Sequence, residues 1–464
     1  MQHIFLTLSN RAVYRNFFFF PKSFFYTLCK TAKDKNFKVI VLVEAKDVPK
    51  YREQIKSEIG LHCDIEGVEV TIPVTRLGKL FYFFYSYLIY TDTTKLLATF
   101  GTRPDEPPAG GKRYLQPLKW LISRTFGLIP PIKTKLVPWL FIRIYSDKRP
   151  FQTLFKKYSP KLIFTSHLYG WFDQTLLAEA KRQKVKTLGM AANWDHLDKY
   201  FLPLHVDTFV AQSNERIDPA MRYQNYSRDS VVISGYPHFD FITERSYVIS
   251  RADVLKSLSL PPDAKFILYA SGSTYCPDEP EVIGEIIKWI EAGVFGSNVY
   301  LLVRPYLGGR GKDREFDEEK FNTFEQHPRV RFYRKDFWAD LNFGIEFMNI
   351  LRQADVVVAI FTTMALEAVV LDRPVVAVGF DGFRIRPFRR SVRRFELFVH
   401  FQQVRKTGAM QTARTFPELQ NMIKENIDNP TLKAKERAVM REFIAGPLDG
   451  KASERITKVI TDNL

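Results

Sequence analysis

The segment of residues 354–382 carries the clearest chemical signal in the sequence. Its pattern predicts a buried strand, a threonine-containing turn, a short helix and a second strand. A helix that begins near Thr362 and Thr363 offers two hydroxyl groups and unpaired backbone N–H groups, which suit a diphosphate. Glu367, about one turn further along, is placed to bond ribose hydroxyls. In the alternative interpretation, Thr363 only caps the helix and Glu367 lies on its solvated face.

Two other loops follow predicted strands in the same half of the chain. Gly272 and Ser273 close the strand FILYASG, and a Gly/Ser turn lets backbone N–H groups approach a phosphate. Arg304 lies at the end of the next strand, VYLLVRP, and supplies a positive charge. We expect these three residues to hold the same ligand as Thr362 and the helix that follows it.

Apolar, β-branched runs recur along the chain with helical stretches between them, which indicates parallel sheets covered on both faces. We therefore expect an α/β fold of two doubly wound parallel-sheet domains that face a ligand-binding cleft. The predicted strands of the first series are residues 4–9, 37–45, 68–74, 161–166, 186–193, 208–213 and 231–235. Those of the second series are residues 266–272, 299–305, 330–333, 355–360 and 374–380.

A polar, proline-containing stretch at residues 236–250 separates the two series. The domains are therefore predicted at residues 1–240 and 241–464, the first with a helical insert at about residues 76–150. The basic charge is uneven, because residues 1–250 carry 36 basic and 22 acidic side chains and the rest of the chain carries 32 and 29.

The composition excludes several classes of protein. With 464 residues, 45% hydrophobic and 26% charged, the chain is long enough for large cores and is neither fibrous nor mainly disordered. The net charge of +17 favours anionic ligands, but no RNA- or DNA-binding motif accompanies it, so no nucleic-acid partner is expected. Cys29, Cys63 and Cys276 are scattered without metal-ligand spacing, which predicts no metal site and reduced, cytosolic thiols.

No membrane-spanning helix is predicted, because the longest apolar run, residues 80–90, has 11 residues and a spanning helix needs about 20. The N-terminus has neither a basic start nor a small-residue cleavage site, so secretion is not expected.

Residues 111–149 contain nine Lys and Arg against the single acid Asp147, interleaved with aromatic side chains. This composition is typical of a segment that lies in a membrane interface. The candidate contacts with an anionic membrane or an anionic acceptor are Trp120, Lys133, Lys135, Trp139 and Arg143. The alternative is a helical insert packed into the core with a solvated basic rim.

A second basic cluster, residues 383–395, contains six arginines, which is more than one nucleotide requires. Arg389 and Arg390 are therefore added to the candidate contacts with an anionic lipid or acceptor, since arginine binds phosphates through two parallel hydrogen bonds. A solvated basic loop is the competing interpretation.

The 354–382 segment resembles the donor-nucleotide motif of GT-B glycosyltransferases, in which Ser or Thr precedes a short helix bearing Glu and a proline-led strand follows. Thr362, Thr363, Glu367 and Pro374 occupy the matching positions. The resemblance implies a GT-B fold, a nucleotide-activated sugar or polyol as donor, no resident cofactor and no obligatory metal.

Other segments resemble enzymes of envelope-polymer synthesis. The tail at residues 441–460 is similar to the end of CDP-glycerol glycerophosphotransferases. Residues 193–200, 206–215 and 231–240 resemble blocks of surface-polysaccharide glycosyltransferases. The glycerophosphotransferases carry a histidine after the strand that ends here in Arg304-Pro305-Tyr306-Leu307, and its absence disfavours glycerol-phosphate transfer.

An inverting glycosyl transfer needs a general base within about 2.6–3.2 Å of the acceptor hydroxyl. His167, Asp173 and Asp195 each follow a predicted strand of the first domain or start the next element. We favour His167, whose side chain titrates near neutrality and which lies in a loose form of the family's His-Gly motif. The competing interpretations are a buried structural histidine and, for Asp195, an Asx turn.

The sequence thus predicts a metal-independent GT-B glycosyltransferase that builds a cell-envelope polysaccharide or lipid-linked glycan. Its expected partners are a nucleotide sugar, a lipid-linked or polysaccharide acceptor and an anionic membrane surface, which would place it in the cytoplasm on the inner face of the cell membrane. The alternatives are a CDP-polyol phosphotransferase of teichoic-acid type, a hexosamine-nucleotide epimerase on the same fold, and a non-catalytic GT-B-like scaffold.

Overall fold

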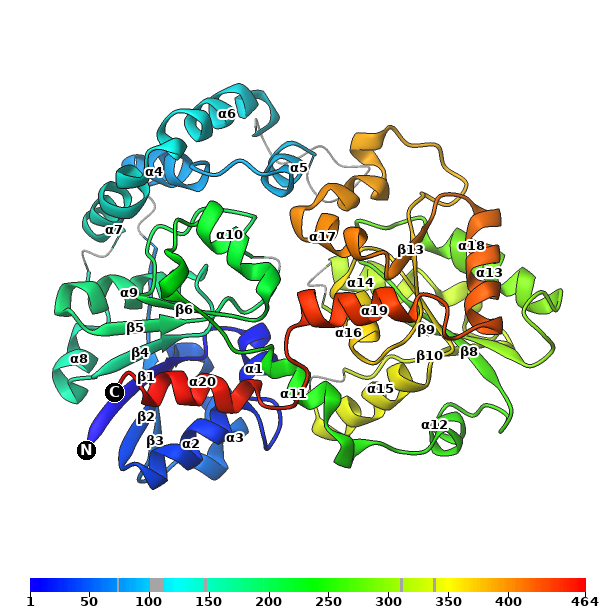
Figure 1. Cartoon of the computed structure of the whole chain (residues 1–464), viewed down its shortest axis with the longest axis horizontal. Helices are drawn as coiled ribbons and strands as arrows, with labels where there is room; N and C mark the ends of the chain where they lie inside the picture. The colour runs from blue at the N-terminus through cyan, green and yellow to red at the C-terminus, as the bar shows by residue number, and fades with distance from the viewer. Residues whose placement is uncertain (73–74, 101–111, 146–147, 195, 309–311, 337–338) are drawn as a thin grey trace. The chain divides into compact units, whose positions relative to one another are not determined.

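The computed structural model of the chain describes residues 1–72, 75–100, 112–145, 148–194, 196–308, 312–336 and 339–464. The chain forms two compact units (Figure 1). The first comprises Met1–Thr94, Leu115–Phe241 and Phe443–Leu464, and the second comprises Lys95–Tyr114 and Ile242–Glu442. Each unit is built around one parallel sheet.

The sheet of the first unit has seven parallel strands in the order β3-β2-β1-β4-β5-β6-β7. The strands are β1 (Gln2–Thr7), β2 (Phe37–Glu44), β3 (Cys63–Val68), β4 (Leu162–Thr165), β5 (Lys186–Gly189), β6 (Thr208–Ala211) and β7 (Val231–Ile233). Its helices outside the insert are α1 (Arg11–Phe17), α2 (Phe24–Asp34), α3 (Val48–Gln54), α8 (Gln152–Tyr158), α9 (Trp171–Gln183), α10 (Ile217–Arg222), α11 (Pro237–Thr243) and α20 (Ala452–Thr461).

Both faces of this sheet are buried, as its unbroken apolar strands predict. Leu6 and Val41 belong to a core cluster that includes α1, α2 and α20. Phe5 and Ile40, the alternate residues of the same strands, belong to a second cluster with α8 and α9. Successive side chains of a strand point to opposite faces, so helices cover the sheet on both sides.

The second unit contains a six-stranded parallel sheet in the order β10-β9-β8-β11-β12-β13. The strands are β8 (Lys265–Ala270), β9 (Val299–Arg304), β10 (Val330–Phe332), β11 (Val356–Ala359), β12 (Val375–Val378) and β13 (Met410–Ala413). The helices are α12 (Arg251–Ser257), α13 (Glu279–Glu291), α14 (Lys312–Glu319), α15 (Leu341–Gln353), α16 (Thr363–Val370), α17 (Val399–Thr407), α18 (Phe416–Asp428) and α19 (Ala434–Met440). The prediction of two doubly wound parallel-sheet units is confirmed.

The predicted helical insert contains α4 (Arg76–Ser86), α5 (Asp92–Phe100), α6 (Gln116–Arg124) and α7 (Val137–Tyr145). Contrary to the predicted first domain, Lys95–Tyr114 belongs to the second unit, so most of α5 lies there. Two strand predictions need correction. The strand expected at 68–74 lies earlier, at Cys63–Val68, where Cys63 and Ile65 are buried. The short β13 was missed, because only its first and last residues are buried and it has no apolar run.

The C-terminal tail departs from the predicted domain at residues 241–464. Residues 443–464 lie in the first unit, where Ile456 and Ile460 are fully buried in the same core cluster as α2. The Asp240 carboxylate accepts hydrogen bonds from the N–H groups of Ala452 (3.1 Å) and Ser453 (2.8 Å) at the start of α20. The 231–240 and 441–460 segments therefore meet through the capping of α20.

Replacing Asp240 with Ala should remove both of these charge-assisted bonds and lower the free energy of unfolding by about 1.5–3 kcal/mol. Urea denaturation followed by circular dichroism measures the change. The matched control is Asp462→Ala at the other end of the same helix, where an exposed pair with Lys458 contributes less than about 1 kcal/mol. Equal losses in the two variants would contradict the capping role of Asp240.

Candidate functional site

Each sheet has one point at which the strand order reverses, between β1 and β4 in the first unit and between β8 and β11 in the second. The loops that leave the two strands at such a point diverge to opposite faces, which opens a crevice at their carboxyl ends. The loops after β8 and β11 contain Gly272 and Thr362. The loop after β4 contains His167, and β1 ends at Thr7. The residues singled out in the sequence thus gather at these two points.

In the second unit the loops after β8 and β11 approach closely at Gly272. A Cβ atom on Gly272 would lie 2.4 Å from Cδ1 of Ile360 and 3.1 Å from Cε2 of Tyr275. A Cβ atom as close as 2.4 Å to another atom is essentially never found, so a side chain at position 272 would require Ile360 to shift, whereas glycine fits without that shift. This close approach brings the loop after β8 alongside the strand end that leads into α16.

Thr362 precedes α16 with extended backbone (φ −132°, ψ 164°) and occupies the N-cap position. Its side chain makes no capping hydrogen bond, and its Oγ1 atom is buried without a hydrogen-bond partner in the described part of the chain. Thr363 begins the helix, whose first-turn N–H groups carry a partial positive charge. The start of α16 is therefore suited to an anion that accepts hydrogen bonds.

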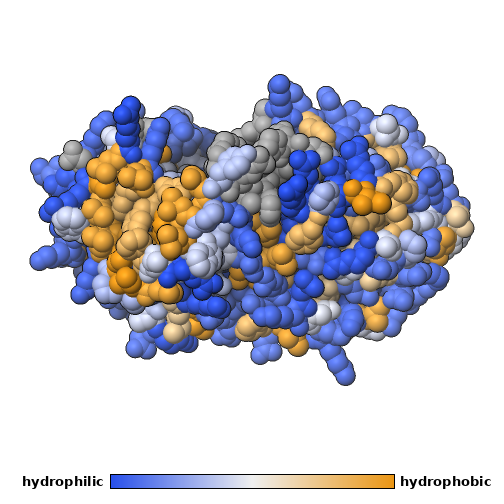
Figure 2. All heavy atoms as spheres, turned by 90° about the horizontal axis from the view of Figure 1, so that it is seen from above, coloured by the Kyte–Doolittle hydropathy of each residue, from blue (hydrophilic) through white to orange (hydrophobic). Residues whose placement is uncertain are grey.

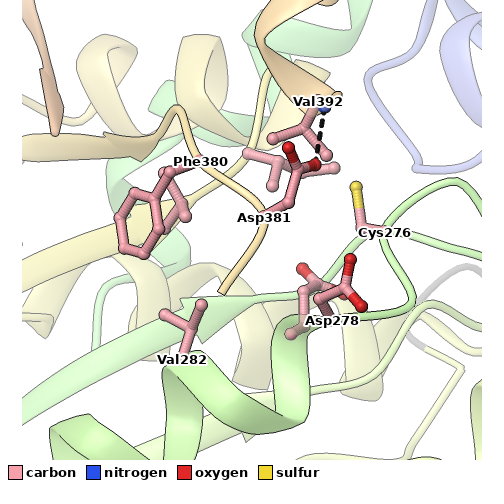
Figure 3. A pocket seen from close by; sticks show the side chains of 9 residues that line it. Cys276, Asp278, Val282, Phe380, Asp381 and Val392 are labelled. Carbon is pink, nitrogen blue, oxygen red and sulfur yellow. Dashed lines mark hydrogen bonds between the residues drawn. The ribbon is translucent and has the colours of Figure 1, made fainter. Parts of the chain in front are cut away.

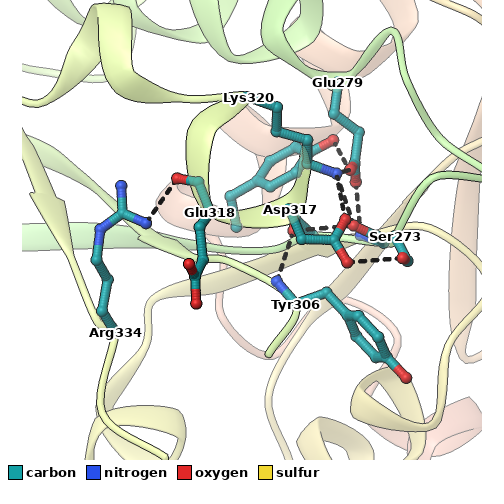
Figure 4. Close-up of polar contacts among 10 residues, drawn as sticks. Ser273, Glu279, Tyr306, Asp317, Glu318, Lys320 and Arg334 are labelled. Carbon is teal, nitrogen blue, oxygen red and sulfur yellow. Dashed lines mark hydrogen bonds and ion pairs between the residues drawn. The ribbon is translucent and has the colours of Figure 1, made fainter. Parts of the chain in front are cut away.

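The sequence-based expectation for Gly272 and Ser273 needs correction (Figure 4). The Gly272 N–H group, expected to meet a phosphate, donates to Oε1 of Glu279 at 2.9 Å. The Gly272 carbonyl accepts from Lys320 at 2.7 Å, and the Ser273 hydroxyl donates to Asp317 at 2.7 Å. These groups hold the loop in place, since their hydrogen-bonding capacity is used inside the protein.

Glu279 and Lys320 form the centre of this support. Their carboxylate and ammonium groups lie 2.7 Å apart, and each side chain is at most 3% exposed. Burial raises the pKa of Glu279, while Lys320 and the Gly272 N–H group oppose the rise. Removing either ion would leave the other charge buried and unpaired, which is strongly destabilising.

Arg304 and Glu367 flank the same edge of the sheet. Arg304 pairs in register with Ala270, the last residue of β8, and its guanidinium lies 5.8 Å from the ring centroid of Phe347. Glu367 is on α16 and is only 4% exposed. The exposed position of the alternative interpretation is therefore wrong for Glu367, and its contact with ribose stays a prediction.

The arginine-rich segment after β12 is partly internal. Arg386 forms a two-pronged pair with Asp278, at 3.0 and 3.1 Å, and Arg394 is 1% exposed. Arg389 and Arg390 are exposed and stay candidates for an anionic partner. The six arginines thus divide between roles inside the unit and roles at its surface.

A small pocket lies beside this segment, between the start of α13 and the loop after β12 (Figure 3). Its polar lining includes Asp278, which pairs with Arg386, and Asp381, whose Oδ1 accepts from the Val392 N–H group at 2.9 Å. Val282 and Phe380 form part of the apolar wall. Carboxylates repel phosphate, so we place no phosphate here.

In the first unit, Asp173 connects the two loops at the reversal point. It is the third residue of α9 and has no exposed surface. Thr7 at the end of β1 donates to its Oδ1 at 2.6 Å, and the Ser166 N–H group after β4 donates to the Thr7 hydroxyl at 2.9 Å. Burial raises the pKa of Asp173 to about 7, although the hydrogen bond from Thr7 lowers it. A group this deeply buried positions its neighbours.

Gly170, the N-cap of α9, lies beside both His167 and Asp173. A Cβ atom on Gly170 would lie 2.7 Å from Nδ1 of His167 and 3.1 Å from Oδ2 of Asp173. Burial lowers the pKa of His167 to about 4, so the expected titration near neutrality is wrong for this side chain, and the imidazole is neutral and only weakly basic at pH 7. Two of the three candidate bases therefore lie side by side, and the third, Asp195, is outside the described residues.

His196 belongs to the same group and was missed in the sequence. Its ring centroid lies 5.5 Å from that of His167 and 5.1 Å from that of Tyr169, and its Nε2 lies 3.2 Å from the side-chain amide nitrogen of Asn193. The 193–200 segment that carries the family resemblance is thus next to the candidate base. The histidine in that segment was the available signal.

The candidate membrane contacts of the insert are mostly exposed, but one of them is buried. Trp120 and Trp139 are 53% and 47% exposed, and Lys135 and Arg143 are exposed. The expectation for Lys133 is wrong, because this side chain is only 5% exposed and its ammonium lies over the Phe201 ring, 5.6 Å from the centroid. Burial lowers the pKa of Lys133 to about 8.

Comparison with known proteins gives a fold and no sequence family. No protein-family model matches the sequence, and no curated protein matches it. The MnaA–UDP co-structure from S. aureus is 14% identical, with 100% of this chain and 98% of that one covered and a TM-score of 0.53. A UDP-GlcNAc 2-epimerase from Neisseria meningitidis bound to UDP-GlcNAc is 9% identical, with 100% of both chains covered and a TM-score of 0.53.

A glycosyltransferase from Rickettsia africae is 10% identical, with 100% of this chain and 99% of that one covered and a TM-score of 0.50. This chain has a GT-B fold. The fold expected from the Thr362–Glu367 motif is thereby confirmed. Among the described residues, no group of three or more His, Cys, Asp or Glu side chains is placed to hold a metal ion.

The raised pKa of Asp173 predicts a measurable pH dependence. Its carboxyl titrates near pH 7 when folded and near pH 4 when unfolded, so its contribution to stability is complete below pH 4 and is lost as the pH rises to 7. Asp173→Asn keeps an uncharged group, and between pH 4 and pH 7 the wild type should lose up to about 4 kcal/mol relative to this variant.

Urea denaturation at a series of pH values measures this difference. The control is Asp34→Asn, at an exposed position, for which the difference from wild type should stay constant. A flat difference for Asp173→Asn would show that the carboxylate is charged and stable in the folded protein.

Proposed function

We propose that this protein is a glycosyltransferase that uses a nucleotide-activated sugar to build a cell-envelope polysaccharide or lipid-linked glycan. The observation that carries the proposal is the buried, unpartnered hydroxyl of Thr362 at the start of α16, at the strand-order reversal of the second sheet. The GT-B fold supports it, since proteins of this fold have been solved with UDP and with UDP-GlcNAc.

The donor diphosphate is assigned to the start of α16. The hydroxyls of Thr362 and Thr363 and the first N–H groups of the helix donate to phosphate oxygens, and the helix dipole favours their negative charge. Arg304, at the end of β9, adds a full positive charge at the same edge of the sheet. When the bond to the sugar breaks, these groups stabilise the charge that develops on the leaving diphosphate.

The acceptor side is assigned to the first unit. His167 is neutral at pH 7 and takes the proton from the acceptor hydroxyl as that oxygen attacks the sugar. Asp173 and Gly170 hold the loop after β4 against α9, so that the imidazole keeps one position. The proposed acceptor is a lipid-linked or polysaccharide chain on the inner face of the cell membrane.

A second candidate function is epimerisation of a UDP-hexosamine. It is supported by the similar fold of the N. meningitidis UDP-GlcNAc 2-epimerase. Both functions use the same nucleotide site, so they are separated by their products. Incubation with UDP-GlcNAc alone, followed by chromatography of the sugar nucleotides, yields the 2-epimer only if the second candidate is right.

Replacing Thr362 with Val keeps the shape of the side chain and removes the hydroxyl. Because a hydrogen bond to a charged phosphate contributes about 1.5–3 kcal/mol, nucleotide affinity should fall about 10- to 150-fold. Calorimetry with UDP-, CDP- and GDP-sugars measures it. The control is Thr407→Val at the end of α17, where the hydroxyl donates to the Val404 carbonyl. Unchanged affinity in Thr362→Val would remove the central support for the donor site.

Replacing His167 with Ala should lower turnover about 10²- to 10⁴-fold while nucleotide affinity stays the same, because the imidazole acts on the acceptor. Steady-state kinetics and calorimetry on the same preparation separate the two effects. If turnover is kept in His167→Ala and lost in Asp195→Ala, Asp195 is the base.

A further inference from the structure

Exposed apolar side chains are concentrated on the helical insert of the first unit. Of 25 large hydrophobic residues that are exposed among the described residues, 12 lie in the first unit between residues 77 and 139. They include Leu80 (67% exposed), Leu118 (45%), Trp120 (53%), Leu128 (67%) and Trp139 (47%). We call these exposed apolar residues of the insert, together, the insert surface. Seen from above, the molecule carries a broad area of hydrophobic residues (Figure 2).

The insert does not need these side chains for its own packing. Its helices bury a different set of residues between them, including Phe81 of α4, Ile122 of α6 and Phe141 of α7. The Phe81 and Tyr145 rings lie 5.9 Å apart, and the Tyr145 hydroxyl donates to the Gly78 carbonyl. The insert surface is therefore a second apolar face, and monomeric proteins rarely leave so large a face in water without a partner.

The positive charge of the insert favours an anionic partner. Residues 75–100 and 112–145 contain ten Lys and Arg and one acid, Asp92. Arg124, Lys135 and Arg143 are exposed on the same helices as the insert surface or between them. The Arg143 guanidinium lies 4.0 Å from the ring centroid of Trp139, so a positive charge and an indole occupy the same place on α7.

We propose that the insert surface docks on an anionic phospholipid bilayer. Tryptophan is enriched at the depth of the headgroups, leucine side chains enter the acyl boundary, and Lys and Arg attract anionic headgroups. None of the helices in the described part of the chain has the length and apolar character of a membrane span. The proposed contact is with the headgroups and acyl boundary of one leaflet. The docking surface extends the proposed function, whose acceptor is lipid-linked, but does not depend on it.

A second copy of the chain fits this surface less well. In a twofold dimer the same patch faces itself, which would bring the positive charges of both copies together. Apolar contact would have to overcome that repulsion, whereas an anionic leaflet is attracted by the same charges. The dimer therefore becomes an outcome that the experiment must separate.

The test is co-sedimentation of the full chain with phosphatidylcholine vesicles that contain phosphatidylglycerol, compared with pure phosphatidylcholine, at low and high salt. Wild type should bind the anionic vesicles, less so at high salt. Trp120→Ser combined with Leu128→Ser should weaken binding at least about tenfold, and Lys135→Glu combined with Arg143→Glu should do the same.

Matched controls use exposed residues outside the insert. Leu61 is 71% exposed, and Leu61→Ser should bind like the wild type. Lys35→Glu changes an exposed charge by the same amount per residue as Lys135→Glu and should also bind normally. All variants should keep the wild-type melting temperature and nucleotide affinity, because the substituted side chains are exposed and outside the nucleotide site.

Three results would overturn the inference: no sedimentation of the wild type with anionic vesicles at low salt, equal binding of the insert variants and the controls, or a dimer by light scattering that the Trp120→Ser, Leu128→Ser variant makes monomeric. None of these bears on the donor site, which calorimetry with the nucleotide sugar tests separately. Loss of nucleotide binding with normal vesicle binding would instead overturn the proposed function and leave the docking surface in place.

Discussion

The second unit depends on the close approach of the loops that leave β8 and β11. Gly272 permits it without strain, because a Cβ atom there would lie 2.4 Å from Cδ1 of Ile360, which would have to shift. Backbone groups forced this close to a neighbouring strand need internal partners, and the buried Glu279–Lys320 pair supplies them on both sides of Gly272. Because Glu279 and Lys320 occupy the backbone groups of Gly272, the start of α16 is the position at this edge with polar groups suited to a ligand.

The first unit also has a strand-order reversal, between β1 and β4, and a buried carboxylate lies there as well. Gly170 lies against His167 and Asp173, and the buried carboxylate of Asp173 accepts a hydrogen bond from Thr7 at the end of β1. The difference is in the partner of the carboxylate. Glu279 is bonded by Lys320, whereas hydroxyls bond Asp173, whose pKa burial raises to about 7. One reversal point therefore has a positive helix start suited to phosphate, and the other holds a neutral histidine beside a carboxyl group near its titration point.

Much of the fold was predictable, because Val- and Ile-rich runs such as those of β2, β11 and β12 are typical of strands buried on both faces. β13 was not, since its middle residues are half-exposed. The position of the tail was hidden as well, because Ile456 and Ile460 form an apolar helix face that would fit any core. Among the described residues, hydrogen bonds from the start of α20 to Asp240 and from Arg455 to the Ser234 carbonyl fix the tail to the first unit.

The candidate site was predictable in its residue types and less so in their roles. A Gly/Ser turn and a lysine in a basic segment are typical of phosphate and lipid contacts. Gly272 and Lys133 have other roles because of contacts that their own segments do not show: Glu279 and Lys320 for Gly272, and Phe201 for Lys133. Thr362 was identified correctly as the start of a helix, since a hydroxyl before a short apolar helix is a local signal.

The central claim is that the start of α16 holds the donor diphosphate. Hydrogen exchange of the full chain, followed by mass spectrometry with and without the nucleotide sugar that binds most tightly, tests it directly. We predict slower exchange in the peptide that contains Thr362 and the first turn of α16, with no change in the peptide that contains β3. Saturating nucleotide sugar that leaves the exchange of the α16 peptide unchanged would contradict the claim.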